Sequence, residues 1–162
     1  MDINTPRGQE TLVDERVVAM WAEREFGVRY VETPKGQPAT VDAIITDTHA
    51  QEIRAVVETK CRYDVDLDGF RRRYRSEWLV TWDKIDKAMT LAQGLGVPLV
   101  GFLYLPSSRA LLMVRISHPD GRLAVPIRLQ TTETRATVNG GRAVRTNAFI
   151  DLSSAKAYRV ES

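Results

Sequence analysis

The sequence predicts an α/β domain in which helices flank a mixed β-sheet. Apolar residues recur at helical spacing in two segments, 9–26 and 82–95. Short apolar runs of strand length lie between and after these segments, and 97–105 is nearly continuous, as in a strand buried on both faces. From about residue 123 to residue 162 the chain alternates loosely between apolar and polar residues, which predicts a mostly β extension behind a core of about residues 9–116.

The composition is typical of a soluble globular protein. The 162 residues fit a single domain, with 43% hydrophobic and 27% charged residues. Because the net charge is only +2, affinity for nucleic acid must come from local clusters. The single cysteine, Cys61, excludes an internal disulfide and fits a reducing cytoplasm, where we expect the protein to reside. No apolar stretch has the roughly 20 residues that span a bilayer, so no membrane partner is expected.

The first helix is predicted over residues 9–26, with Pro6 or Thr5 as further candidates to open it and Gly27 to end it. Its stronger apolar stripe consists of Val13, Val17, Met20 and Trp21. Glu10 lies on this stripe, whereas Glu15 lies on a weaker one. That weaker stripe also carries Val18, Ala22 and Phe26. Residues 28–33 are predicted to form a strand, and a turn rich in proline follows.

Residues 41–60, VDAIITDTHAQEIRAVVETK, predict an antiparallel hairpin that turns around Ala50. Pairing position 46 with 54 sets Asp42 opposite Glu58, and directly opposed residues point to the same side of a sheet. Alternation of side chains places Lys60 on the same face as Glu58. Opposed carboxylates, with Cβ atoms roughly 5 Å apart, are destabilising unless a cation neutralises them. The hairpin therefore predicts a patch of Asp42, Glu58 and Lys60 that favours a divalent metal.

Residues 61–77, CRYDVDLDGFRRRYRSE, are predicted to form a charged loop with room for a short helix. Basic and aromatic residues are mixed in it, which suits phosphate contact and base stacking. A solvated loop in which its three aspartates pair with its arginines is the alternative interpretation. The nucleic-acid-binding candidates from this segment are Arg62, Arg71, Arg72, Arg73 and Arg75.

The remaining elements follow from capping residues and turn residues. Thr81 is a predicted N-cap for the helix over 82–95, whose expected buried face is Ile85, Ala88, Met89 and Ala92. Strands are predicted over 97–105 and 111–116. In the extension, Asn139-Gly140-Gly141 predicts a hairpin turn. The basic residues around that turn, which either contact a second nucleic-acid backbone or have no specific role, are Arg135, Arg142 and Arg145.

The order of helix, strand, Asp-bearing strand, Glu-x-Lys strand, helix and strand resembles the PD-(D/E)XK nuclease superfamily. Within it, the chain looks most like small Holliday-junction resolvases of the archaeal type and phage-encoded nucleases. The resemblance covers roughly residues 9–116: Asp42 matches the motif's aspartate, and Glu58-Thr59-Lys60 matches its E-x-K. Val41 stands where many members have proline. The extension from about residue 123 matches nothing in the family.

The resemblance implies a restriction-endonuclease-like core and a Mg²⁺- or Mn²⁺-dependent DNA endonuclease, acting in repair, recombination or phage DNA processing. Asp42, Glu58 and the main-chain carbonyl of Thr59 would hold the metal, and Lys60 would position or deprotonate the attacking water. An acid of the first helix would complete the site. The apolar stripe favours Glu10 for this role and the distance to Gly27 favours Glu15, so both stay open.

Three further expectations come from the resemblance. Family members often bring a polar residue from the second helix to the site, and Lys84 is the candidate, with a role in nucleic-acid binding. Many nucleases of this type form homodimers, so a homodimer is one possible assembly. The superfamily also contains inactive members, and the alternative function is therefore a catalytically inactive DNA-binding protein of the same fold.

Overall fold

The computed structural model describes residues 4–34, 39–133 and 144–161. A six-stranded sheet with the order β1-β2-β3-β5-β6-β9 lies at the centre, and a three-stranded sheet has the order β4-β8-β7. In chain order the elements are α1 (Pro6–Phe26), β1 (Arg29–Glu32), β2 (Ala43–Thr46), β3 (Ile53–Cys61), α2 (Leu67–Arg73), β4 (Glu77–Thr81), α3 (Trp82–Gly94), β5 (Leu99–Leu105), the 3₁₀ turn η1 (Pro106–Ser108), β6 (Ala110–Ser117), β7 (Ile127–Glu133), β8 (Val144–Asp151) and β9 (Lys156–Arg159).

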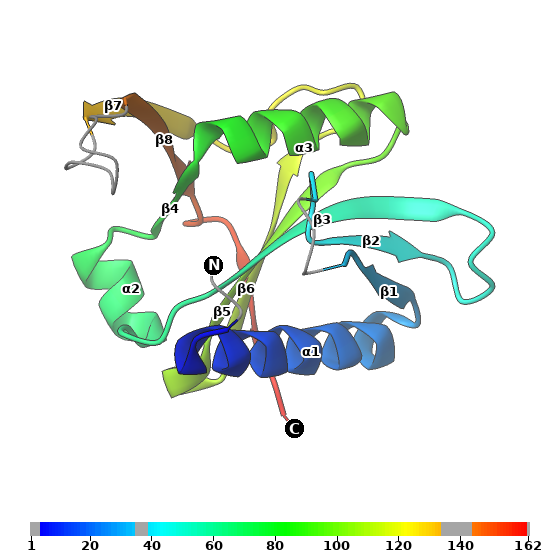
Figure 1. Ribbon diagram of the computed structural model, residues 1–162, viewed down its shortest axis with the longest axis horizontal. Coiled ribbons are helices and arrows are strands. Elements are labelled where there is room, and N and C mark those ends of the chain that lie inside the picture. Colours follow the sequence, from blue (N-terminus) through cyan, green and yellow to red (C-terminus); the bar gives the residue numbers. More distant parts are fainter. Residues whose placement is uncertain (1–3, 35–38, 134–143, 162) are drawn as a thin grey trace.

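The central sheet is mixed and lies between two helices, as the sequence predicts (Figure 1). β3 and β5 pair in parallel, whereas β1–β2, β2–β3, β5–β6 and β6–β9 pair antiparallel. α1 packs on one face of the sheet and α3 on the other, and each helix closes its own cluster of buried apolar side chains. The predicted α/β architecture, a mixed sheet flanked by helices, is therefore confirmed. Among the described residues, no helix is both long and apolar enough to cross a membrane.

α1 differs from its prediction in its start and in its buried face. It begins at Pro6, three residues earlier than 9, because the Thr5 hydroxyl accepts the N–H of Gly8 at 3.0 Å and proline suits the first helical position. Gly27, at φ 61°, ends it as predicted. Half of the predicted stripe is wrong, since Val13 is 64% and Met20 56% exposed, whereas Trp21 is buried and Val17 packs partly buried against the core. Small residues let the helix approach the sheet closely, and the buried positions are Gly8, Thr11, Glu15, Val18, Ala19, Trp21 and Ala22.

The predicted hairpin of β2 and β3 forms, with one change of register. The pairs Ala43–Val57, Ile44–Val56 and Ile45–Ala55 follow the predicted register. An irregularity after Ile45 then pairs Thr46 with Ile53 rather than with position 54, so that part of the prediction is wrong. The turn accounts for the shift: the Asp47 carboxylate accepts the N–H groups of Gln51 and Glu52 at 2.8 and 3.3 Å. Ala50 lies in this turn at φ 56°.

The segment predicted as a charged loop contains α2 and leads into β4, which the sequence does not predict. Asp66 caps α2 by accepting the N–H of Gly69 at 2.7 Å. β4 is a strand because it pairs with β8 of the C-terminal extension, about seventy residues away in the sequence, and such a partner leaves no local signal. Thr81 takes the N-cap position of α3 as predicted, although its side chain makes no capping hydrogen bond.

The extension is mostly β, as predicted, but it serves both sheets. β7 and β8 pair antiparallel beside β4, whereas β9 returns to the central sheet and pairs with β6 (Figure 1). The predicted turn Asn139-Gly140-Gly141, with Arg135 and Arg142, lies outside the described residues. Arg145 is an exposed residue of β8.

Candidate functional site

The site begins where β3 runs beyond its partner β2. Val57 is the last residue of β3 that pairs with β2, and its carbonyl accepts the N–H of Asp42 at 3.1 Å. β3 itself continues to Cys61. The Asp42 carboxylate then takes the place of a strand partner, because its Oδ2 accepts the N–H of Thr59 at 2.8 Å. A backbone hydrogen bond therefore fixes the Asp42 side chain at this open edge.

Glu58 and Lys84 meet Asp42 at the same place. Glu58 is only 3% exposed and contacts the Nζ of Lys84, which also lies 3.2 Å from Oδ1 of Asp42. Lys84 belongs to the first turn of α3, so the helix on this face of the sheet supplies the cation between the two carboxylates. The structure thus brings Asp42, Glu58 and Lys84 together.

The electrostatics of this cluster favour a further cation. Burial raises the pKa of Glu58 to about 8, the negative charge of Asp42 adds to the increase, and Lys84 opposes it. Burial lowers the pKa of Lys84, but the negative charges of Glu58 and Asp42 raise it by more. The pKa of Lys84 is therefore raised overall. Oε2 of Glu58 is buried and has no hydrogen-bond partner among the described residues. When both carboxylates are ionised, Lys84 therefore offsets only one of their two negative charges.

The main chain of Thr59 offers one more oxygen. Val56 and Arg62 direct their N–H groups toward β5, where they bond to the carbonyls of Pro98 and Tyr104. Backbone polar groups of successive strand residues point to opposite edges, so those of Thr59 face the other way, beside Asp42. The side chain of Thr59 lies on the α1 face, where its hydroxyl and that of Tyr30 are 2.7 Å apart.

Lys60, the predicted partner of the two carboxylates, is exposed. Within the described ranges no ion pair joins it to Asp42 or Glu58, and Lys84 occupies the position between them instead. Lys60 lines an open hollow of about 620 Å³ beside the N-terminus of α1.

The two first-helix candidates have different surroundings. Glu10 is exposed and pairs with Arg7 at 2.9 Å. Glu15 is buried at 8% exposure against the sheet. Burial raises the pKa of Tyr30 above its usual range, and Asp42 and Glu15 both add to this increase, so Tyr30 lies within reach of both charges. In the part of the chain that the structure describes, no group of three or more His, Cys, Asp or Glu residues could hold a metal, so Glu15 does not join the other two acids directly.

Cys61 is a packed side chain and not a nucleophile. Burial raises the pKa of its thiol to about 12, and the charge of Glu15 contributes to the increase. A thiol with this pKa carries almost no thiolate at neutral pH.

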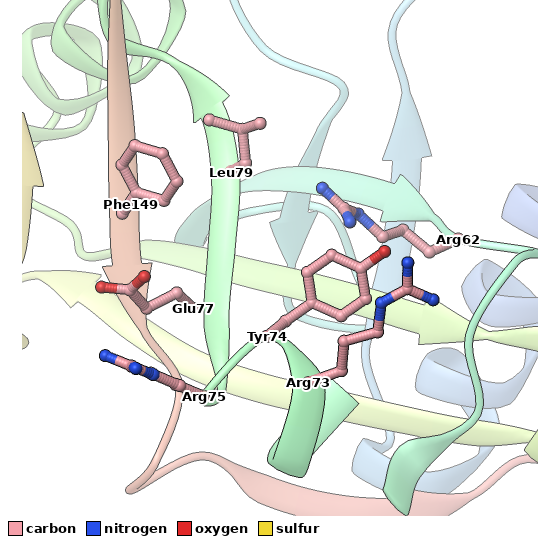
Figure 2. Close-up of a pocket in the computed structure, with 7 residues that line it drawn as sticks. All are labelled: Arg62, Arg73, Tyr74, Arg75, Glu77, Leu79 and Phe149. Carbon is pink, nitrogen blue, oxygen red and sulfur yellow. The ribbon is translucent and has the colours of Figure 1, made fainter. Parts of the chain in front are cut away.

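The predicted arginine cluster divides into two parts. Arg62, Arg73 and Arg75 line one hollow between α2 and β4 (Figure 2). Arg71 is an exposed residue of α2 outside that lining, and Arg72 forms an ion pair with Asp68. The alternative of a loop paired with its own aspartates therefore holds for Arg72. Leu79 of β4 and Phe149 of β8 also line the hollow, and no sequence signal indicates that these two residues meet.

Comparisons with known proteins find similarity among solved structures only. No family model matches the chain, and no curated protein matches it. Among solved structures, the chain is similar to Hjc, a Holliday junction resolvase from the archaeal hyperthermophile Archaeoglobus fulgidus. The identity is 16%, the match covers 64% of this chain and 74% of that chain, and the TM-score is 0.42. Any function for this chain has to rest on the site itself.

Proposed function

We propose that the chain is a metal-dependent nuclease that hydrolyses phosphodiester bonds in DNA. The observation that carries this proposal is the burial of Glu58 against Asp42 at the open edge of β3, with an unbonded carboxylate oxygen and a pKa near 8. Two acids held this close in a protein interior are costly, and such arrangements cluster at functional sites. The match of Asp42 and of Glu58-Thr59-Lys60 to the family motif supports the same assignment.

The residues present fit Mg²⁺ or Mn²⁺. Mg²⁺ takes oxygen ligands, often only one or two carboxylates, and keeps several waters. Asp42, Glu58 and the carbonyl of Thr59 would hold it. When bound, the metal would polarise the scissile phosphate and lower the pKa of a bound water.

The other side chains would act on charge and on water. Lys84 would release the two carboxylates and then offset negative charge on the phosphoryl group in the transition state. Lys60, on the next position of the same β3 face as Glu58, would position the attacking water. Glu15 would act as a positioning residue through Tyr30 and Thr59, since it does not reach the carboxylates directly.

A DNA-binding protein without catalysis is the second candidate, and Lys84 favours it. Its ammonium already contacts both carboxylates, and the described residues place no third acid beside them. In a protein without catalysis, the ammonium of Lys84 would occupy the place of a metal ion between the two carboxylates.

Cleavage of a DNA panel tests the proposal. Linear duplex, single strand, flap and four-way junction are incubated with Mg²⁺, Mn²⁺ or EDTA. We expect metal-dependent cleavage that falls roughly 10³-fold in Asp42→Ala, because metal activation is worth several kcal/mol. Asp83→Asn is the matched control, since Asp83 is exposed, next to Lys84, and paired with Lys87. Equal cleavage by wild type and Asp42→Ala contradicts the site, and binding of DNA without any cleavage supports the second candidate.

Glu15→Gln is expected to lower cleavage roughly 10- to 100-fold, the usual effect of removing a group that orients metal ligands. Glu10→Gln should stay within about twofold of wild type, because Glu10 forms an exposed ion pair of the kind that contributes little. Initial rates of both variants on the best DNA of the panel measure the difference. A larger loss in Glu10→Gln would mean that the exposed face of α1 contacts the substrate.

A further inference from the structure

A hollow of about 350 Å³ lies between the C-terminal end of α2 and the three-stranded sheet (Figure 2). Ligand clefts begin at about 300 Å³, so this one has room for a single base with its sugar. β4 and β8 form one wall, and α2 with the segment that follows it forms the other. The lining residues are Arg62, Arg73, Tyr74, Arg75, Glu77, Leu79 and Phe149.

The hollow has an excess of positive charge. The guanidinium carbons of Arg62 and Arg73 lie 5.4 and 5.6 Å from the ring centroid of Tyr74. In the described part of the chain, no carboxylate forms an ion pair with Arg62, Arg73 or Arg75. Glu77, the acid of the lining, is already paired with Arg128 at 3.0 Å. Guanidinium groups gathered without a counter-ion repel each other, and a phosphate matches their geometry.

Apolar surface lies beside these charges. Tyr74 lies between Arg62 and Arg73 on one side and Leu79 and Phe149 on the other, whereas Arg75 points away from the other two arginines on the side of Glu77 (Figure 2). Leu79 is 39% exposed and lines the hollow together with Phe149, so apolar surface is accessible there. A site for a free phosphate needs no such wall, whereas a nucleotide needs both an anion site and a surface for its base.

The backbone at this point is strained. Arg75 and Ser76 have φ values of 52° and 60°, and two successive residues other than glycine in the left-handed region are uncommon. Hydrogen bonds hold them there: the N–H of Ser76 bonds to the carbonyl of Phe70 at 3.2 Å, and the carbonyl of Ser76 accepts the N–H of Leu152 at 2.8 Å. Strain that the surroundings maintain is typical of ligand-binding positions.

The hollow lies in line with the candidate metal site. Glu58, Lys60 and Arg62 are alternate residues, so they point to the same face of the chain. Four residues of strand span about 13 Å between Glu58 and Arg62. A strand of duplex DNA rises about 3.4 Å per nucleotide, so this distance corresponds to about four nucleotides. One DNA strand can therefore contact both places.

We propose that this hollow binds an unpaired nucleotide of the DNA substrate, with its base between Tyr74 and the Leu79–Phe149 wall and its phosphate on Arg62 and Arg73. This inference rests on the proposed function and narrows its substrate to DNA that has a single-stranded segment near the cleaved bond. A paired base is held in the helical stack and cannot enter a pocket of this kind without leaving it.

Binding in EDTA tests the proposal without cleavage. Fluorescence anisotropy compares a labelled twelve-nucleotide poly-dT strand with a blunt duplex. We expect the single strand to bind at least about tenfold more tightly, and Arg73→Ala and Tyr74→Leu each to weaken it roughly tenfold. Arg54→Ala is the matched control, expected within about twofold of wild type. Arg54 is exposed at the opposite end of β3 and pairs with Glu52.

Two measurements separate binding from folding. Tyr74 stacks on Phe70 with centroids 6.5 Å apart, so thermal unfolding of Tyr74→Leu is recorded with its affinity. Tyr74→Phe keeps the ring and should rescue single-strand binding. The proposal is overturned if single strand and duplex bind equally, if Arg54→Ala and Arg73→Ala lose the same affinity, if folded Tyr74→Leu binds like wild type, or if no DNA binds at all.

The two proposals fail in different ways. If only the pocket is wrong, cleavage that depends on Asp42 persists while Arg73→Ala binds and cleaves like wild type. If only the nuclease assignment is wrong, the preference for a single strand and its loss in Arg73→Ala persist, but no DNA of the panel is cut.

Discussion

Glu58→Gln is expected to lose metal-dependent cleavage by roughly 10³-fold, because the metal loses a charged ligand. The same substitution should make the metal-free protein more stable at pH 8. Glu58 is 3% exposed beside Asp42, and a neutral amide in its place removes the cost of burying a second negative charge. Loss of function would thus accompany a gain in the free energy of unfolding.

The shifted pKa of Glu58 explains why Glu58→Gln should stabilise the protein and at which pH. The pKa of Glu58 rises from 4.5 in the unfolded chain to about 8 in the folded protein. Between these values the folded protein retains a proton that the unfolded chain releases, so stability falls as the pH rises. The contribution is fully present below 4.5 and is lost as the pH passes about 8. We expect the difference from Glu58→Gln, on the order of a few kcal/mol, to be largest above that pH.

Thermal unfolding in EDTA between pH 4.5 and 9 measures this difference. Glu52→Gln, at an exposed glutamate in the β2–β3 turn, is the control and should change neither cleavage nor the pH slope. In a parallel series without EDTA, added Mg²⁺ should stabilise wild type but not Glu58→Gln, because a ligand stabilises only the state that binds it. If Glu58→Gln retained cleavage, Glu58 would not be a residue of the active site. If the free energy of unfolding of Glu58→Gln varied with pH as in wild type, a group other than Glu58 would cause that pH dependence.

Trp78→Ala is expected to cost roughly 3–5 kcal/mol of the free energy of unfolding, as for other large buried aromatic residues. Trp78 is 0% exposed and joins β4 to the central sheet. It packs so closely on Gly101 of β5 that a Cβ atom there would lie 2.5 Å from the indole ring. Gly101 is the β5 partner of Glu58, so Trp78 attaches the second sheet next to the candidate site, on the face of the sheet that α3 covers.

Urea unfolding of Trp78→Ala and Leu79→Ala checks this prediction. The two residues are neighbours on β4, but Leu79 is 39% exposed, and its truncation should cost less than about 1 kcal/mol. Equal losses in the two variants would show that the second sheet is held by its strand pairing rather than by Trp78.

The sequence alone determined the local part of this protein. The spacing within residues 41–60 specified the hairpin and the register of Ala43–Val57, which sets Asp42 beside Glu58, because alternation and pairing leave little freedom in a short hairpin. Gly27 at the end of α1 and Thr81 before α3 likewise marked boundaries through backbone chemistry that is local to each residue.

Tertiary structure decided the rest, because it depends on which surfaces meet. Glu15 rather than Glu10 became buried, since the buried face of α1 carries Val18 and Trp21 and leaves Val13 and Met20 exposed. Lys84 rather than Lys60 reached the two carboxylates, because α3 crosses the sheet directly above them. The hollow between α2 and the three-stranded sheet forms only because β4 pairs with β8. These strands are distant in the sequence, and neither short sequence indicates which strand it pairs with.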